Sequence, residues 1–310
     1  MKKPPVWTLI IFAISLYIIM GIYADFEKLF SVMKEFRWEF LFILFFLTTL
    51  NYLLRFVKWN FFLKKAGIYL DIKDNLFVFF SGLSMIITPG KIGEIWKGWL
   101  IKDISGEKLS KTIPVIIVER ITDVLGFVII SVIGIVCFQQ IGYFVLVLLL
   151  ILSMFWIIIR SKSVWYWIIS KIENRMEKHA ENLKTMHNTF EIITKPKYLI
   201  LMSGLSAAGW FFECVGMYLV VLGFKEYINI VLSALVFSIA SLAGAISMVP
   251  GGLGIAEGTL FGLLQFFGIS SAKSVGISLV VRFGTLWYGA VMGMCIYLLF
   301  KRKIRKNIKI

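Results

Sequence analysis

The sequence predicts an all-α integral membrane protein with about six spanning helices and two re-entrant or broken helical hairpins in an inverted repeat. Hydrophobic residues make up 59% of the 310 residues and charged residues only 16%, which is typical of polytopic membrane proteins. Several apolar stretches are long enough to cross a bilayer. One short Pro-Gly phrase also occurs twice, each time inside a hydrophobic stretch. This repetition indicates a duplicated site.

Six apolar windows are predicted to span the membrane. A helix needs about 20 residues to cross roughly 30 Å of hydrocarbon, and each window approaches or exceeds that length. The first window is interpreted as a signal anchor, because it is long and has no clear small-residue cleavage site. The windows are 6–24, 40–63, 113–138, 141–159, 198–222 and 275–300.

Four shorter apolar segments carry the repeated phrase at their junctions. Segments 75–88 and 92–101 are each too short to span, because about 14 helical residues reach only about 21 Å. Segments 229–249 and 253–268 form a longer pair with the same central break. A Pro-Gly break between short apolar halves is typical of a helix that enters the membrane, turns and returns. Both pairs are interpreted as re-entrant hairpins, although two full crossings would leave the flanking loops on the same sides.

The distribution of Lys and Arg predicts the orientation of the chain. Short cytoplasmic loops of membrane proteins are rich in Lys and Arg. If residue 2 lies on the cytoplasmic side, most of the 33 basic residues fall in cytoplasmic segments. Both termini are therefore predicted to be cytoplasmic, in a multi-pass protein of the cell membrane. Connector 160–197 alternates apolar and basic residues, which predicts a cytoplasmic amphipathic helix on the inner membrane surface. The basic tail 301–309 is interpreted as an inside anchor, and no nucleic-acid partner is expected.

This topology divides the single membrane domain 1–310 into two repeat units. The first unit is 39–138 and its hairpin enters from the cytoplasmic side. The second unit is 198–300 and its hairpin enters from the outside, so the repeat has inverted topology. Transporters built in this way hold their substrate where the two units meet, near the middle of the membrane.

The two hairpin tips are predicted to bind an anion, most plausibly a phosphate. A new half-helix begins after each Pro-Gly, so unpaired backbone N–H groups and the positive end of a helix dipole face the membrane interior. Glycines allow close approach of a ligand, and an arginine can bind a phosphate through two hydrogen bonds. The predicted substrate-binding residues are Pro89, Gly90, Lys91, Gly93, Glu94, Glu119, Arg120, Asp123, Pro250, Gly251, Gly252, Gly254, Glu257 and Arg282.

The charged residues of the tips also have a structural interpretation. Glu94 and Glu257 either take part in ligand binding or pair with Arg120 and Arg282 across the inverted repeat. Such an ion pair at a repeat interface can also act as a gate. Glu213 is a further acid inside the membrane, where a carboxylate is costly unless it is paired or wet.

Other polar residues in the apolar segments also have plain structural interpretations. Gly93 and Gly254 serve either the ligand or only tight turns and helix packing. Lys58 and Lys97 are expected to extend to the cytoplasmic interface rather than to line a pathway. His179 and His187 are expected to be bystanders on the connector, and neither a metal nor a cofactor is expected.

Three stretches together resemble the flippase-like membrane domain of lysylphosphatidylglycerol synthases. They are Ile-Thr-Pro-Gly-Lys-Ile-Gly-Glu at 87–94, Val-Glu-Arg-Ile-Thr-Asp at 118–123 and Val-Pro-Gly-Gly-Leu-Gly-Ile-Ala-Glu at 249–257, followed by Arg282. The resemblance covers nearly the whole chain in the same order. It implies a membrane protein whose relatives move, or help modify, anionic or aminoacylated phospholipids and other lipid-linked substrates. The membrane domain is expected to stand alone, and Lys91 departs from the family pattern of glycine or arginine, which suggests a different headgroup.

The leading hypothesis is membrane translocation, or flipping, of an anionic or lipid-linked phosphate-containing lipid. The expected partners are a membrane lipid with an anionic headgroup and a separate lipid-modifying enzyme. No nucleotide-binding loop is present in the sequence, so energy must come from a gradient or from consumption of the lipid. The alternative is a lipid-modifying transferase, or its membrane subunit, with Glu119 and Asp123 as acid and base. An ion or small-solute transporter is a third class.

Overall fold

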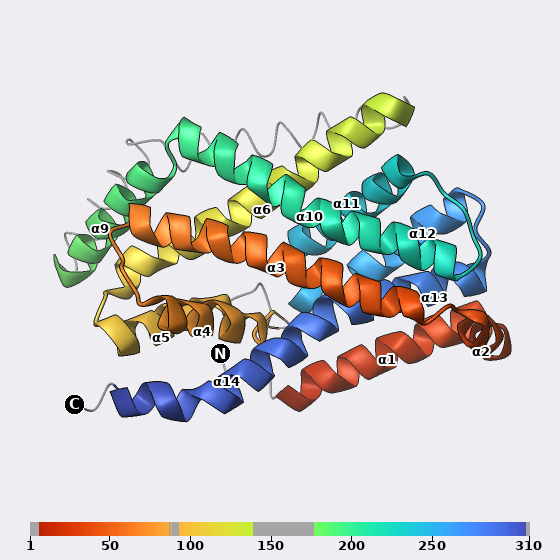
Figure 1. Ribbon diagram of the computed structural model, residues 1–310, viewed down its shortest axis with the longest axis horizontal. Coiled ribbons are helices and arrows are strands. Elements are labelled where there is room, and N and C mark those ends of the chain that lie inside the picture. The colour runs from red at the N-terminus through yellow and green to blue at the C-terminus, as the bar shows by residue number, and fades with distance from the viewer. Residues whose placement is uncertain (1–5, 87, 89–92, 139–176, 308–310) are drawn as a thin grey trace.

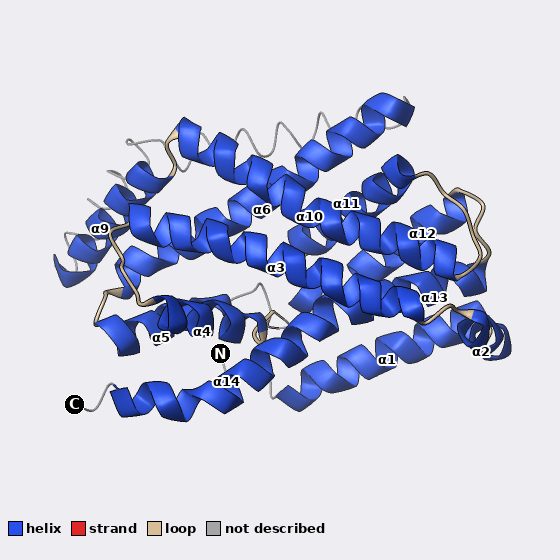
Figure 2. Cartoon of the chain, viewed as in Figure 1, coloured by secondary structure: helices blue, strands red, loops and turns tan. Residues whose placement is uncertain are grey.

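The described part of the chain is built entirely from helices joined by loops and turns (Figure 2). A computed structural model describes residues 6–86, 88, 93–138 and 177–307, apart from the side chains at some of their ends. The prediction of a helical membrane protein is confirmed. The helices of the first half are α1 (Val6–Ala24), α2 (Phe26–Glu35), α3 (Glu39–Lys65), α4 (Ile72–Leu83), α5 (Ile95–Ser105) and α6 (Leu109–Phe138). Those of the second half are α9 (Glu177–Ile193), α10 (Pro196–Gly223), α11 (Ile230–Ile246), α12 (Ile255–Phe266), α13 (Ser271–Arg282) and α14 (Tyr288–Asn307), with a 3-10 turn η2 (Pro250–Gly252) and a π-helical turn η3 (Phe283–Trp287).

Long helices run along the long axis of the molecule (Figure 1). Among the described residues, three helical runs are long and apolar enough to cross a membrane: α3, α10 and the continuous run Ser271–Phe300. Helix α6 has 30 residues, or about 45 Å, but it carries three charged residues near its middle. The predicted window 141–159 lies outside the described residues. The count of six spans therefore stays a prediction.

The two predicted hairpins form as pairs of short helices. Helices α4 and α5 have 12 and 11 residues, which is about 17–18 Å each, so neither can cross the hydrocarbon alone. Helices α11 and α12 have 17 and 12 residues. The members of each pair pack on each other, and the two pairs lie toward opposite ends of the long axis (Figure 1).

Polar side chains and glycines set the ends of the hairpin helices. The Asn229 side chain accepts hydrogen bonds from the N–H groups of Val231 and Leu232, at 2.6 and 3.0 Å, and so caps the start of α11. Helix α5 ends at Gly106, whose φ of 74° places it in the left-handed region that closes a helix. The second hairpin therefore begins, and the first hairpin ends, where the sequence offers a cap.

Two apolar clusters divide the long helices between them. One cluster takes the first part of α3 and the later parts of α6 and α10, with Leu44, Val128 and Val221 among its members. The other takes the later part of α3 and the first parts of α6 and α10, and it contains Trp59 and Val118. The buried charged residues of these three helices fall near the boundary between the clusters. The core is thus apolar at both ends and ionised in the middle.

Connector 160–197 is helical in its described part, where α9 runs from Glu177 to Ile193. Phe190 and Ile193 are buried in the second apolar cluster. At least these two apolar side chains of α9 therefore pack against other helices of the protein. Its predicted position on the inner membrane surface stays a prediction, and residues 160–176 lie outside the described residues.

The last helical run joins both halves of the molecule. Helix α13 packs on α12, whereas α14 packs on α4. The α14–α4 contact is close at Gly293, where an added Cβ would lie 2.5 Å from the backbone nitrogen of Ser84 and 2.6 Å from the carbonyl oxygen of Phe80. Only glycine allows this approach of two helix backbones.

We expect Gly293→Ala to destabilise the protein by roughly 1–3 kcal/mol, the usual cost of overpacking, because the neighbouring backbone must move. Gly204→Ala on α10 is the matched control, since nothing lies within 4 Å of its added Cβ. The control should stabilise by roughly 0.5–1 kcal/mol through helix propensity. Thermal unfolding of the purified protein in detergent checks both. Equal effects of the two substitutions would contradict close α14–α4 packing.

Candidate functional site

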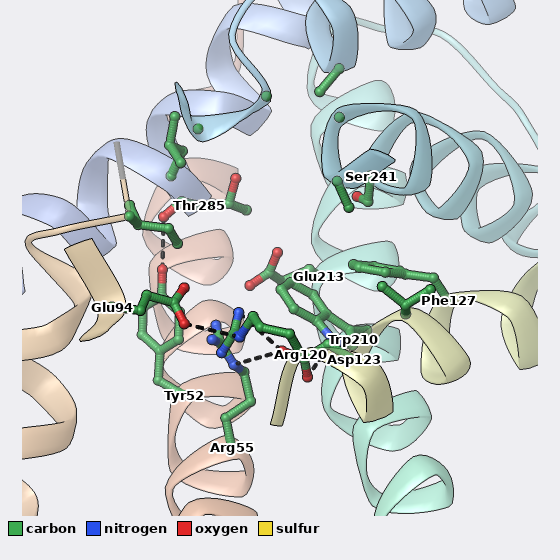
Figure 3. A pocket seen from close by; sticks show the side chains of 18 of the residues that line it. Tyr52, Arg55, Glu94, Arg120, Asp123, Phe127, Trp210, Glu213, Ser241 and Thr285 are labelled. Carbon is green, nitrogen blue, oxygen red and sulfur yellow. Dashed lines mark hydrogen bonds and ion pairs between the residues drawn. The ribbon is translucent and has the colours of Figure 1, made fainter. Parts of the chain in front are cut away.

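A cavity of about 370 Å³ lies between the two hairpins and the long helices. Its polar lining comes from α3, α6, α10, α11, α13 and η3 and from both hairpin tips (Figure 3). The cavity thus collects residues from both halves of the chain. Its polar and glycine lining residues are Tyr52, Arg55, Glu94, Arg120, Asp123, Trp210, Glu213, Ser241, Gly244, Gly251, Gly252, Arg282 and Thr285.

Arg120 on α6 is the centre of the ionised network. Its Nε lies 3.1 Å from Glu94 Oε2, at the first hairpin tip. Its two terminal nitrogens lie 2.6 Å from Glu119 Oε1 and 3.1 Å from Asp123 Oδ2. One guanidinium therefore contacts three carboxylates and still lines the cavity, with its side chain 19% exposed.

Lys58 and Lys97 contradict the expectation that they extend to the cytoplasmic interface. Lys58 on α3 is fully buried, forms an ion pair with Asp123 and donates to Ser206 Oγ at 2.6 Å. The Lys97 Nζ atom on α5 lies 2.6 Å from Glu119 Oε2 and 4.3 Å from the ring centre of Trp59. The expectation was wrong because two carboxylates buried inside the bundle require cations nearby.

Arg55 on α3 is a cavity residue that the predicted site omitted. Its guanidinium lies 3.7 Å from Glu119 Oε1 and 3.8 Å from Asp123 Oδ2, which is longer than a hydrogen bond. The side chain is only 3% exposed, yet its Nε and Nη1 have no hydrogen-bond partner. It also lies 5.2 Å from the ring centre of Trp210. The signal in the sequence was a single arginine inside the apolar window 40–63.

The second hairpin tip holds its own ion pair. Arg282 Nε donates to Glu257 Oε1 at 2.8 Å, and another guanidinium nitrogen donates to the carbonyl of Gly251. The other oxygen of Glu257 accepts the N–H of Gly254 at 2.7 Å, which caps the start of α12. Glu257 is fully buried and does not line the cavity, whereas Arg282 does.

The two acids of the tips pair within their own halves of the chain. Glu94 pairs with Arg120, and Glu257 pairs with Arg282. The sequence interpretation placed these pairs across the inverted repeat, but each pair lies within one repeat unit. Each acid holds an arginine at the cavity wall. The pairing positions the arginines and leaves both of them in contact with the cavity.

Backbone geometry and close packing explain why glycine occupies positions 93 and 254 at the hairpin tips. The Gly93 N–H donates to Thr88 Oγ1 at 2.8 Å, and an added Cβ would lie 2.8 Å from Met85 Cβ. Gly254 has a φ of 85°, in the left-handed region. Neither residue lines the cavity. Packing and turn geometry therefore account for both, which is the structural interpretation considered from the sequence.

Gly251 and Gly252 do line the cavity, with φ angles of 60° and 67°. An added Cβ on Gly252 would lie 2.9 Å from Gly244 Cα, so this tip rests directly on the backbone of α11. Pro250 and Glu119 do not line the cavity. Three residues of the predicted site, Pro89, Gly90 and Lys91, lie outside the described residues.

The cavity wall also has hydrogen bonds from uncharged donors and an apolar part. Trp210 Nε1 donates to Asp123 Oδ1 at 3.2 Å, and the Tyr52 hydroxyl donates to the carbonyl of Thr285 at 2.8 Å. Phe127 and Phe237 add aromatic surface to the lining. A ligand with a charged group and an apolar body suits such a wall.

The connected charges give the cavity a positive balance. Four cations contact three carboxylates in one network, and the Arg282–Glu257 pair is balanced. With all of these groups ionised, the part of the network that the structure describes carries one excess positive charge before Glu213 is counted. Its cations are Arg55, Lys58, Lys97 and Arg120, and its carboxylates are Glu94, Glu119 and Asp123.

The fold and the cavity define a helical membrane protein with an ionised site inside its bundle. The family model of the lysylphosphatidylglycerol synthase TM region matches residues 9–293, and the chain belongs to this family. The resemblance seen in the sequence is therefore confirmed.

The chain is also similar to three membrane proteins from other organisms. The chain is 26% identical to the UPF0104 membrane protein PH1989 of Pyrococcus horikoshii, over 94% of this chain and 96% of that protein. It is 22% identical to the UPF0104 membrane protein MJ1595 of Methanocaldococcus jannaschii, over 96% of each chain. It is 23% identical to MJ1078 of the same organism, over 72% of this chain and 96% of that protein.

We expect Lys58→Met to destabilise the protein by about 3–5 kcal/mol, because it leaves a buried carboxylate short of a cation. Adding Asp123→Asn should recover part of this loss. Lys64→Met, at an exposed position on the same helix, is the control and should stay within about 0.5 kcal/mol of the wild type. Denaturant unfolding in detergent measures all three. If Lys58→Met matched the control, the buried Lys58–Asp123 pair would be disproved.

Proposed function

We propose that this protein translocates an anionic, phosphate-containing lipid between the two leaflets of the cell membrane. The observation that carries the proposal is the cavity where Arg55, Arg120 and Arg282 meet from three different helices. Membership in a family named for the membrane region of a lipid synthase supports a lipid substrate.

A lipid phosphate fits the chemistry of the three arginines. Guanidinium groups bind phosphate oxygens through paired hydrogen bonds, and Arg55 has two nitrogens without a hydrogen-bond partner. Arg120 and Arg282 are held by Glu94 and Glu257, and in our proposal they exchange part of this contact for the ligand. The apolar side of the wall would face the glycerol backbone and the first part of the acyl chains.

The arrangement of the hairpins supports alternating access. In our proposal the chain forms an inverted repeat of units 39–138 and 198–300, with cytoplasmic termini, and each hairpin closes one side of the cavity. Helices α4 and α5 lie toward one end of the molecule and α11 and α12 toward the other (Figure 1). Net movement in one direction requires a different ligand affinity in the two states.

A second candidate is a membrane subunit that presents lipid to a separate lipid-modifying enzyme. The family supports it, because its description names the membrane region of a synthase. In this candidate the cavity would hold the same phosphate, and the chemistry would take place on the partner. Glu119 and Asp123 are weak candidates for acid and base, since both are held in ion pairs.

The test is a vesicle assay with the purified protein and fluorescent NBD-phosphatidylglycerol, in which external dithionite reports lipid that reaches the outer leaflet. We expect Arg55→Gln and Arg282→Gln to slow the movement about tenfold or more, because a hydrogen bond to a charged group contributes about 1.5–3 kcal/mol. Arg37→Gln is the control, since this exposed arginine pairs with Glu39 on the surface and does not line the cavity. Gel filtration checks that each variant is folded.

Two results would overturn the proposal. One is a wild-type rate equal to that of protein-free vesicles, and the other is an unchanged rate in both arginine variants. Mass spectrometry of the recovered lipid separates the two candidates. Chemically altered lipid in the presence of a partner enzyme, without movement by the protein alone, would favour the second.

A further inference from the structure

Glu213 on α10 differs from every other buried carboxylate in the described residues. Glu94, Glu119, Asp123 and Glu257 each have a cation within 4.0 Å. Glu213 is 2% exposed and lines the cavity, but it forms no ion pair among the described residues. It is therefore a buried acid without a counter-ion, at the wall of a charged site.

Asn51 on α3 is the partner of this carboxylate. Its Nδ2 atom donates to Glu213 Oε1 at 2.5 Å. The other atom of the same amide, Asn51 Oδ1, is buried and has no hydrogen-bond donor. A buried acceptor without a donor is uncommon, and a proton on Glu213 would place a donor beside it.

The surroundings of Glu213 mix charges of both signs. Helix α11 contributes no ionisable side chain, because its residues are apolar or carry only hydroxyl groups. Three arginines, Arg55, Arg120 and Arg282, line the same cavity, but none forms an ion pair with the Glu213 carboxylate among the described residues. The ionisable side chains around Glu213 include Tyr52 and Arg55 on α3, Arg120 and Asp123 on α6, Cys214 on α10 and Arg282 on α13.

The charge balance of the cavity depends on the state of Glu213. Counted over the described residues, the remaining network carries one excess positive charge, so an ionised Glu213 brings that total to zero. A protonated Glu213 leaves the excess positive charge for a ligand. An isolated carboxylate inside a membrane protein is costly, and a phosphate in the same cavity adds repulsion. Proton binding and anion binding therefore favour each other.

We propose that Glu213 binds a proton when an anionic lipid occupies the cavity, and that this step couples proton movement to lipid movement. The proposal rests on the proposed function and names its energy source. The proton comes from the aqueous phase and attaches to Oε2, while Oε1 keeps the hydrogen bond from Asn51. When the lipid leaves on the other side of the membrane, its phosphate no longer repels the Glu213 carboxylate. Glu213 then releases the proton to the aqueous phase on that side.

The first test measures proton uptake on binding. Dioctanoyl phosphatidylglycerol is added to the purified full chain in weakly buffered detergent solution that contains a pH-sensitive dye. We expect the wild type to take up protons, and its affinity to fall by up to about tenfold per pH unit as rising pH removes the proton. Glu213→Gln should bind without proton uptake and with an affinity that does not change with pH.

Matched variants keep this test decisive. Glu35→Gln, at an exposed acid paired with Lys225, should behave as the wild type. Glu213→Asp keeps a titrating group and should keep proton uptake with a displaced pH midpoint. Proton uptake that persists in Glu213→Gln, or a wild-type affinity that is constant from pH 5 to 9, would overturn the proposal.

A second arm separates this inference from the proposed function. Wild-type vesicles with NBD-phosphatidylglycerol are given an inward or an outward pH gradient. Lipid movement that ignores the gradient would overturn proton coupling and leave translocation in place. Proton uptake on binding without any lipid movement would support the role of Glu213 and remove translocation.

Discussion

The buried carboxylates of Glu119 and Asp123 constrain the rest of this structure. Removing a carboxylate from water costs several kcal/mol, and the cost is met only when cations and hydrogen-bond donors are held close by. Here the cations arrive from three helices: α3 supplies Arg55 and Lys58, α5 supplies Lys97, and α6 carries Arg120 beside the acids. The ion pair between Lys97 and Glu119 thereby holds the first hairpin against the long helix α6. Helix α10 joins through Ser206 and Trp210, which also donate to Asp123.

Each hairpin tip holds a Glu–Arg ion pair, but the two glutamates differ in how many of their bonds are made within the tip. Both oxygens of Glu257 are engaged, one by Arg282 and one by the N–H of Gly254. Glu94 instead shares Arg120 with two other carboxylates and reaches Lys97 only at 4.0 Å. The second tip is thus a closed unit, whereas the first belongs to a network in which contacts can be exchanged. A ligand that enters the cavity competes with different partners on its two sides.

Much of the fold could be predicted from the sequence, because hydrophobic length and Pro-Gly breaks are local signals. The short hairpin helices, and the selection of Glu94, Arg120 and Arg282, which line the cavity, follow from such patterns. The roles of Lys58 and Lys97 could not be predicted, since a lysine near the end of an apolar segment can extend to water or turn inward. Only the position of Glu119 and Asp123 relative to neighbouring helices decides between the two. Arg55 and Glu213 were missed as cavity residues for the same reason, because a helical sequence alone does not say which face meets which neighbour.

The run from α13 to α14 has a structural consequence. One end packs on α12 of the second hairpin and carries Arg282, and the other end packs on α4 of the first hairpin through Gly293. The π-helical turn η3 lies between α13 and α14, beside the cavity. The carbonyl of its Thr285 accepts a hydrogen bond from the Tyr52 hydroxyl of α3. A π turn is a wide, irregular point in a helix and is often found where a helix serves a function. The α13–α14 run therefore connects α4 of the first hairpin to Arg282 at the second tip, and the irregular turn within this run lies at the cavity wall.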